Sequence, residues 1–310
     1  MSARTLVIVN PRSRNGATGR RWGALEPRLR AELGAFESEF TRGPRDAERI
    51  AREGVRSGIE RVLVAGGDGT LNEVVTGLLA AGLGGYVQIG VLPLGTGGDF
   101  ARSAGMPARM DDAIAALKQA KPRAIDAGRI CYRDRALNET TSYFVNIASF
   151  GISGLIDRFV NQTSKRFGGK ASFLAGTLKA LARYRATSVA VRVDGTLVHD
   201  GPLMIVAAAN GCWFGGGMQI APEARLDDGL LDVVLIPEHP KLKLISKLPL
   251  LYSGRHLGDP ICSFLRGREI VEAEAEPGTV LLDIDGEPLG SLPARIEIMP
   301  QALWLIGSGE

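Results

Sequence analysis

With 310 residues and a net charge of +3, the chain is long enough for two domains that each bury a core, and nothing in its charge indicates bulk nucleic-acid binding. Its three cysteines are widely spaced and its three histidines fall in no metal or triad motif, which argues against structural zinc and triad hydrolases and favours a reducing cytoplasm. No apolar run reaches the ~20 residues that span a bilayer, so we expect a soluble protein.

The first part of the chain alternates strand and helix patterns. A polar loop from Asn10 follows the first apolar run, and a turn from Thr41 follows the second. Successive βα units predict a parallel sheet, and such sheets bind ligands where their strands end. Asn10 and the arginines after it therefore either face phosphates or form an ordinary solvated loop. The expected elements are strands at 5–9 and 36–40 and helices over 19–33 and 46–57.

The stretch at 62–75 organises the rest of the chain. An apolar strand runs into the glycine turn Gly66-Gly67-Asp68-Gly69-Thr70 and re-emerges with helical spacing. Glycines let backbone N–H groups approach an anion closely, and the helix that follows directs its positive end to the same place. Because a carboxylate repels a polyphosphate, Asp68 predicts a nucleotide bound with Mg²⁺. The alternative is a simple Gly-Asp-Gly turn. The residues of this loop match neither the Rossmann fingerprint nor the Walker A motif.

A second glycine loop follows the next strand. The strand is expected at 88–92, and the loop at 93–102 contains Gly95, Thr96 and Asp99. Such a loop can close on the same nucleotide from the opposite side, and two loops of this kind are more specific than one. A helix over 110–118 completes the domain.

From about Arg129 the pattern changes to short alternating strands, which predicts a β-rich second domain. Helices interrupt it at 155–162, 171–184 and 241–252. Strands are expected at 143–147, 188–193, 203–209, 231–236, 269–274 and 280–284, and those at 295–299 and 303–306 close the chain.

Two acidic turns of the second domain contain candidate metal-binding or catalytic residues. The segment 225–232 contains Asp228 beside free carbonyls, hard oxygen ligands that suit Mg²⁺ or Ca²⁺, although a plain surface turn explains it as well. At the end of the 280–284 strand, alternation puts Asp283 and Asp285 on one face. A carboxylate there can take a proton from a hydroxyl as a general base. The alternative is an ordinary acidic hairpin turn.

Taken together, these segments resemble the diacylglycerol kinase catalytic family, specifically its soluble bacterial lipid kinases. The resemblance covers nearly the full chain and implies an N-terminal Rossmann-like α/β nucleotide-binding domain, 1–128 with the returning strands 294–310. A β-sandwich domain at 129–293 would complete the fold, with the active site in the cleft between them. The matching motifs are Asn10-Pro11, 66–74, 93–102, 144–151, 210–232 and 285–287.

This resemblance implies an enzyme that uses ATP and Mg²⁺ to phosphorylate a lipid hydroxyl, working in the cytoplasm at a membrane surface. Glu287 would accept the proton, and Asp68, Asp99 and Asp285 would form the acidic Mg²⁺ network. A structural Mg²⁺ or Ca²⁺ would bind the carbonyls of Arg225 and Leu230 and the carboxylate of Asp228. The residues expected to bind the nucleotide are Asn10, Thr41, Gly66, Gly67, Asp68, Gly69, Thr70, Leu71, Asn72, Gly95 and Thr96.

The sequence departs from the family at two positions and leaves alternatives. Gly98 stands where Asn is usual, which bears on nucleotide affinity or choice, and Arg14 stands where Gly is usual. An NAD kinase shares the central loop, and 137–139 imitates its Asn-Glu motif, but the turn at 227–232 and the final Asp-Gly-Glu argue against it. The other alternative is a nucleotide-binding regulator without activity.

The sequence is compatible with more than one acceptor lipid, more than one oligomeric state and more than one position of the segment 241–252. The acceptor is diacylglycerol, a sphingoid base, ceramide or phosphatidylglycerol, because acyl pockets are lined by ordinary apolar residues. A homodimer is one candidate assembly. The basic and apolar segment 241–252 either lies at the membrane interface or packs into the second domain.

Overall fold

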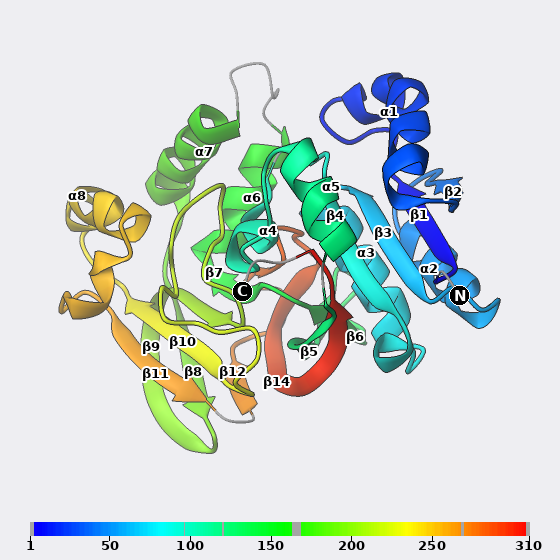
Figure 1. Cartoon of the computed structure of the whole chain (residues 1–310). Coiled ribbons are helices and arrows are strands. Elements are labelled where there is room, and N and C mark those ends of the chain that lie inside the picture. Colours follow the sequence, from blue (N-terminus) through cyan, green and yellow to red (C-terminus); the bar gives the residue numbers. More distant parts are fainter. Residues whose placement is uncertain (1–2, 96, 120, 163–168, 268–269, 308–310) are drawn as a thin grey trace. The chain divides into compact units, whose positions relative to one another are not determined.

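The computed structural model describes residues 3–95, 97–119, 121–162, 169–267 and 270–307. It divides into two compact units, Met1–Ala127 with Pro300–Glu310 and Gly128–Met299 (Figure 1). Two strands, β5 (Arg123–Asp134) and β14 (Gly290–Leu305), contain residues of both units. The expected combination of an α/β domain and a β-rich domain is confirmed.

The first unit contains a parallel sheet in the order β2-β1-β3-β4, and Trp304 and Leu305 of β14 extend it beside β4. The central strands β1 and β3 are buried apolar runs because helices cover both faces of a parallel sheet, whereas the edge strand β2 is polar and partly exposed. Its elements are β1 (Thr5–Val9), α1 (Ala17–Leu33), β2 (Glu37–Phe40), α2 (Asp46–Arg56), β3 (Arg61–Gly66), α3 (Asp68–Leu79), a short 3₁₀ turn (Gly84–Tyr86), β4 (Gln88–Pro93), α4 (Asp99–Ser103) and α5 (Met110–Gln119).

Helices α2 and α3 of this unit pack very closely. A Cβ added to Gly77 of α3 would lie 2.4 Å from the Glu48 carbonyl oxygen of α2. Only glycine allows this approach. The glycine therefore fixes the distance between the helix that follows the 66–70 loop and the helix that follows Thr41.

The second unit is built from antiparallel strands, and its largest apolar cluster includes Phe144, Phe150 and Ile296. The long strand β9 pairs with β8 through its first half and with β10 and β7 through its second half. Its further elements are β6 (Glu139–Phe144), β7 (Ile147–Gly151), α6 (Ile152–Gln162), α7 (Gly169–Arg183), β8 (Thr187–Val193), β9 (Thr196–Ala209), β10 (Leu231–Pro237), α8 (Lys241–Tyr252), a 3₁₀ turn (Arg255–Gly258), β11 (Ser263–Gly267), β12 (Ile270–Glu274) and β13 (Leu282–Ile284).

The structure corrects three of the expected strands. The segment 143–147 is not one strand, because β6 ends at Phe144 and β7 begins at Ile147. The two strands expected at 295–299 and 303–306 are a single strand, β14. Strand β5 was not among the expected strands, because charged side chains such as Arg129 interrupt its apolar pattern.

Candidate active site

The first glycine loop is a tight turn between β3 and α3. A Cβ added to Gly66 would lie 2.5 Å from Thr70 Oγ1, so the turn needs glycine there. Thr70 and Asn72 are buried, and Asn10 Nδ2 donates to Thr70 Oγ1 at 2.9 Å. The structure thus brings Asn10, at the end of β1, against the loop that the sequence singled out.

Asp68 connects the first glycine loop to the second. Its Oδ2 accepts the backbone N–H of Gly98 at 2.9 Å and that of Asp99 at 3.2 Å. The loops also touch directly, since a Cβ added to Gly95 would lie 2.5 Å from the Gly67 Cα. Two glycine loops at the carboxyl ends of β3 and β4 are therefore held together by one carboxylate. Thr96 lies outside the described residues.

The departure at Gly98 has a backbone explanation, and the one at Arg14 has none, because a positive φ favours the usual Gly there. Gly98 has φ 82 and Arg14 has φ 51, both in the left-handed region. Glycine and asparagine both enter that region readily, so Gly98 preserves the backbone that an Asn would give. Asp99 is buried at 6% exposure and its Oδ1 accepts from Arg102 at 2.6 Å. One oxygen of this expected Mg²⁺ ligand therefore already contacts a cation.

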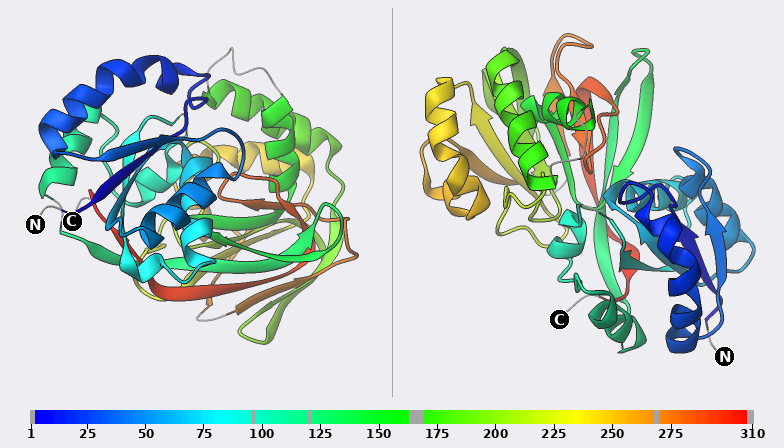
Figure 2. Two further views of the ribbon diagram at one scale, coloured as in Figure 1. Left: turned by 90° about the vertical axis from the view of Figure 1, so that its right-hand side faces the viewer. Right: turned by 90° about the horizontal axis from the view of Figure 1, so that it is seen from above.

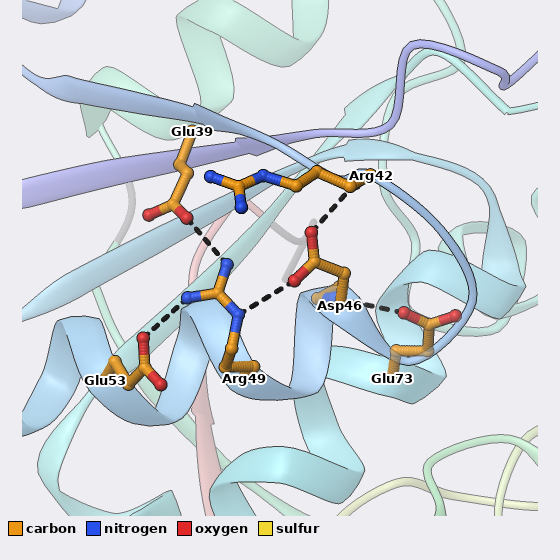
Figure 3. Close-up of polar contacts among 7 residues, drawn as sticks. Glu39, Arg42, Asp46, Arg49, Glu53 and Glu73 are labelled. Atoms are coloured by element: carbon orange, nitrogen blue, oxygen red, sulfur yellow. Dashed lines mark hydrogen bonds and ion pairs between the residues drawn. The ribbon is translucent and has the colours of Figure 1, made fainter.

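The loop after β2 carries Thr41 and is braced by charged side chains (Figure 3). The Thr41 N–H donates to the Val9 carbonyl at 2.9 Å, and the Arg42 N–H donates to Asp46 Oδ2 at 2.8 Å. These contacts fix the path of the loop beside β1. The guanidinium of Arg49 forms ion pairs with Glu39 at 3.0 Å, Asp46 at 2.9 Å and Glu53 at 2.6 Å.

Glu73 ties this loop to the first glycine loop, and sequence reasoning did not identify it. Its Oε2 accepts the Ala47 N–H at 3.1 Å at the start of α2 (Figure 3). Burial raises the pKa of Glu73, while backbone N–H groups of Arg45 and Ala47 act in the opposite direction. Glu73 follows Asn72 directly in α3, so it positions the Thr41 loop relative to the glycine loop.

In the second unit, Glu287 closes a two-residue hairpin turn. Ile284 and Glu287 exchange backbone hydrogen bonds of 3.1 and 3.0 Å. The two central residues, Asp285 and Gly286, have φ values of 50 and 86. Positive φ at both positions matches the right-handed twist of the flanking strands. The turn exposes Glu287, and its role as a proton acceptor stays a prediction.

The carboxylate of Asp285 holds this turn against the break between β6 and β7. Its Oδ2 accepts the Val145 N–H at 3.0 Å. Its Oδ1 accepts those of Asn146 and Ile147 at 3.1 and 2.9 Å. These three bonds explain why the expected strand at 143–147 is interrupted. Both oxygens thus have backbone donors, and a part for Asp285 in Mg²⁺ binding stays a prediction.

Beneath the turn lies a buried pair of carboxyl groups, Asp283 and Asp157, of which sequence reasoning missed Asp157. Asp283 Oδ1 accepts the Gly286 N–H at 2.8 Å, and Asp283 Oδ2 accepts from Ser149 Oγ at 3.4 Å. Burial, and next the neighbouring charge of Asp157, raise the pKa of Asp283 well above its usual range. Asp157 Oδ2 and Ser153 Oγ are buried without a partner among the described residues. Ser153 and Asp157 are four residues apart on α6 and so lie on one face of the helix. This pair of polar residues on an apolar helix was the signal in the sequence that could have pointed to Asp157.

We expect the substitution Asp157→Asn to reduce the dependence of stability on pH. Burial raises the pKa of Asp157 to about 6, so the folded protein holds this proton more tightly than the unfolded chain. The resulting stabilisation is full below the unfolded pKa and is lost as pH rises through about 6. Asparagine stays neutral, so the melting temperature at pH 8 should rise by roughly 3–8 °C relative to the parent.

Thermal unfolding between pH 5 and pH 8 measures this effect. Asp200→Asn changes an exposed carboxylate of the same unit and serves as the control. An Asp157→Asn protein with the pH dependence of the parent would show that Asp157 does not take up a proton on folding.

The expected ligands of the structural metal lie in one turn before β10. Asp228 is exposed, its Oδ1 accepts the Leu230 N–H at 3.1 Å, and Gly229 between them has φ 69. No group of three or more histidine, cysteine or acidic side chains suited to a metal occurs in the described part of the chain. A metal site in this turn stays a prediction, with the carbonyls of Arg225 and Leu230 and the carboxylate of Asp228 as its expected donors, oxygen ligands that would suit a hard cation.

Asp232 adds a second carboxylate to the same segment. It is 2% exposed, and its Oδ1 accepts from Arg266 Nε at 3.0 Å. Its Oδ2 is buried without a hydrogen-bond partner among the described residues. Burial raises the pKa of Asp232 and Arg266 opposes the shift, while Asp228 adds a smaller repulsion. A cation near Asp228 would relieve that repulsion.

Comparisons with known proteins identify the family. Residues 4–130 match the diacylglycerol kinase catalytic domain, and residues 146–307 match the YegS C-terminal NAD kinase beta sandwich-like domain. A probable lipid kinase YegS-like of Chromohalobacter salexigens is 35% identical over 264 residues, 84% of this chain and 80% of that protein. One of Yersinia enterocolitica is 30% identical over 258 residues, 83% of this chain and 82% of that protein.

Solved structures share the fold. A diacylglycerol kinase from Bacillus anthracis superposes with a TM-score of 0.74 at 22% identity, over 98% of this chain and 96% of that one. Yeast NADH kinase complexed with NADH gives 0.55 at 12% identity, over 100% of this chain and 84% of that one. The resemblance inferred from the motifs is thus confirmed, and the chain is a kinase that belongs to the YegS-like branch of the diacylglycerol kinase catalytic domain family.

Proposed function

We propose that the protein transfers the γ-phosphate of ATP to a lipid hydroxyl in a reaction that requires Mg²⁺. The observation that carries this proposal is the pair of glycine loops joined by Asp68, whose Oδ2 accepts two N–H groups of the second loop. Loops of this kind at the ends of neighbouring parallel strands suit the phosphates of a nucleotide. Membership of a family of lipid kinases supports the acceptor class.

The nucleotide would lie against the first unit. The backbone of residues 66–70 and the N-terminus of α3 would receive its phosphates, with Asn10 and Thr41 on neighbouring strand ends. Asp68 would hold Mg²⁺ more readily than Asp99, because Asp99 already contacts Arg102. Bound Mg²⁺ neutralises charge on the transferring phosphoryl group.

The second unit would supply the proton acceptor. Glu287 would take the proton of the lipid hydroxyl as that oxygen attacks the γ-phosphorus. Its turn is held by Asp285, through the N–H groups of residues 145–147, and by Asp283, through the Gly286 N–H. These contacts would keep the Glu287 backbone fixed while its side chain stays exposed.

NAD kinase activity is the second candidate because yeast NADH kinase shares the fold. The Asn-Glu pair within 137–139, which resembles an NAD kinase motif, does not favour NAD kinase activity. Asn138 belongs to the β5–β6 hairpin, where its N–H donates to Asp134 Oδ1 at 2.9 Å and Leu137 has φ 64. These residues therefore have a turn-forming role.

The test is an assay with γ-labelled ATP and Mg²⁺ over separate acceptors: diacylglycerol, a sphingoid base, ceramide, phosphatidylglycerol and NAD⁺. Label on one of the lipids supports the proposal and names the acceptor. Label on NAD⁺ alone contradicts it. Bound ATP without transfer to any acceptor would favour a regulatory protein.

We expect Mg²⁺ or Ca²⁺ to stabilise the protein through the Asp228 turn. A cation that binds only the folded state at a hundred times its Kd adds about 2.7 kcal/mol. Thermal unfolding with and without each cation measures the effect, and Asp228→Ala should abolish it. Asp227→Ala is the matched control, because Asp227 Oδ1 pairs with Arg225 instead. An unchanged melting temperature of the parent in both cations would rule out the site.

A further inference from the structure

Helix α8 presents two different faces. Leu244 is 8% exposed and, with Leu248, packs into the apolar cluster shared by α6, α7 and α8. On the other side, Leu242 is 81% exposed and Ile245 39% exposed. Pro249 is also exposed and, at a spacing of four from Ile245, lies on the same face. From the sequence, this segment either lies at the membrane interface or packs into the second domain. In the structure, Leu244 and Leu248 pack into the domain, while Leu242, Ile245 and Pro249 are exposed.

The outer face is apolar, and the charged side chains of the helix itself are all basic. The helix contains Lys241, Lys243 and Lys247 and no acidic residue. Lys241 Nζ donates to the Ala182 carbonyl at the end of α7, with which α8 lies side by side (Figures 1 and 2). Lys247 pairs with Asp259 at 2.5 Å. Lysines beside an exposed apolar stripe are typical of helices that lie in the interface of an anionic bilayer.

We propose that the outer face of α8, formed by Leu242, Ile245 and Pro249 with Lys243 beside them, docks on an anionic lipid bilayer. The biological purpose of this docking rests on the proposed function, because a kinase needs a membrane surface only if its acceptor is a lipid. Its physical basis is independent of that function. Insertion of the apolar side chains removes their surface from water, and the lysine attracts anionic headgroups. Among the described residues, no helix is both long and apolar enough to cross a membrane.

Vesicle sedimentation tests the proposal with the full chain. Vesicles of phosphatidylcholine alone are compared with vesicles that also contain phosphatidylglycerol. We expect the parent to bind the anionic vesicles, and the double substitution Leu242→Glu with Ile245→Glu to weaken binding at least tenfold. Lys243→Glu should weaken it severalfold, with a smaller dependence on salt. Lys243 is the lysine to change because Lys241 and Lys247 have contacts within the protein.

Two controls match these changes. Leu197→Glu alters a leucine of 46% exposure on β9, and Lys121→Glu alters an exposed lysine of the first unit by the same charge. Both should bind like the parent. The proposal is overturned if the α8 variants bind anionic vesicles as well as the parent does, or if the parent binds neither kind of vesicle. Thermal unfolding verifies that each variant is folded.

A second measurement separates this proposal from the proposed function. Phosphate transfer to a short-chain, water-soluble acceptor requires no membrane, so the α8 variants should retain it. A parent that binds vesicles through α8 but phosphorylates no lipid would contradict the proposed function and leave the docking face standing. A parent that phosphorylates lipid while its α8 variants act on vesicles as well as it does would contradict the docking face.

Discussion

Glu287→Gln is expected to lower kcat by a factor on the order of 10²–10⁴ while ATP binding is retained. Glutamine keeps the shape of the side chain and removes its basicity. The backbone bonds between Ile284 and Glu287 do not involve the side chain, so the turn should persist in the variant. Steady-state kinetics measures kcat, and calorimetric titration with ATP measures binding.

Glu276→Gln, another exposed glutamate of the second unit, is the control and should leave kcat unchanged. A Glu287→Gln protein with normal kcat would show that the base lies elsewhere, with Asp68 the next candidate. Loss of ATP affinity in place of kcat would assign Glu287 to nucleotide binding.

Asp68→Asn is expected to lower kcat/KM at least 10²-fold, because it changes both charge and geometry. Asp68 Oδ2 accepts the N–H groups of Gly98 and Asp99. An asparagine has no negative charge beside Mg²⁺ in either orientation. Its single oxygen can accept those N–H groups, which turns the NH₂ donor toward Mg²⁺, or face Mg²⁺, which turns the NH₂ donor toward the N–H groups. Weaker bridging should also reduce stability by about 1–3 kcal/mol.

Gly97→Ala disturbs the same oxygen without a change of charge. A Cβ at this position would lie 2.5 Å from Asp68 Oδ2, so the carboxylate must move. We expect a raised KM for ATP in this variant, measured beside Asp112→Asn on α5 as a control. Full activity of a folded Asp68→Asn protein at saturating Mg²⁺ would contradict the role of the carboxylate.

Local patterns in the sequence predicted most of the first unit. β1 and β3 are short apolar runs that end in turns of polar residues or glycine, so their positions and the loops after them can be read from neighbouring residues. The Asp68 bridge could not be read in this way. Its acceptor and donors are 30 and 31 residues apart, and no local pattern encodes that contact.

In the second unit, contacts between residues far apart in the sequence decide even more of the structure, and local patterns do not predict them. Asp285 binds N–H groups about 140 residues earlier in the chain, and this contact ends β6 and starts β7. Asp157 and Asp283 meet because β13 pairs with β7, which α6 follows. Alternation was expected to put Asp283 and Asp285 on one face, but β13 ends at Ile284 and Asp285 lies in the following turn with φ 50. The partners that bury Asp283 and bind Asp285 come from the tertiary fold.

The most direct test of the central claim follows the label from γ-labelled ATP in a reaction with Mg²⁺ and a total lipid extract, separated into organic and aqueous phases. We expect labelled lipid in the organic phase with the parent, and a rate of labelling lower by about 10² or more with Glu287→Gln. Label that stays in the aqueous phase with the parent, or that passes only to added NAD⁺, would contradict a lipid kinase.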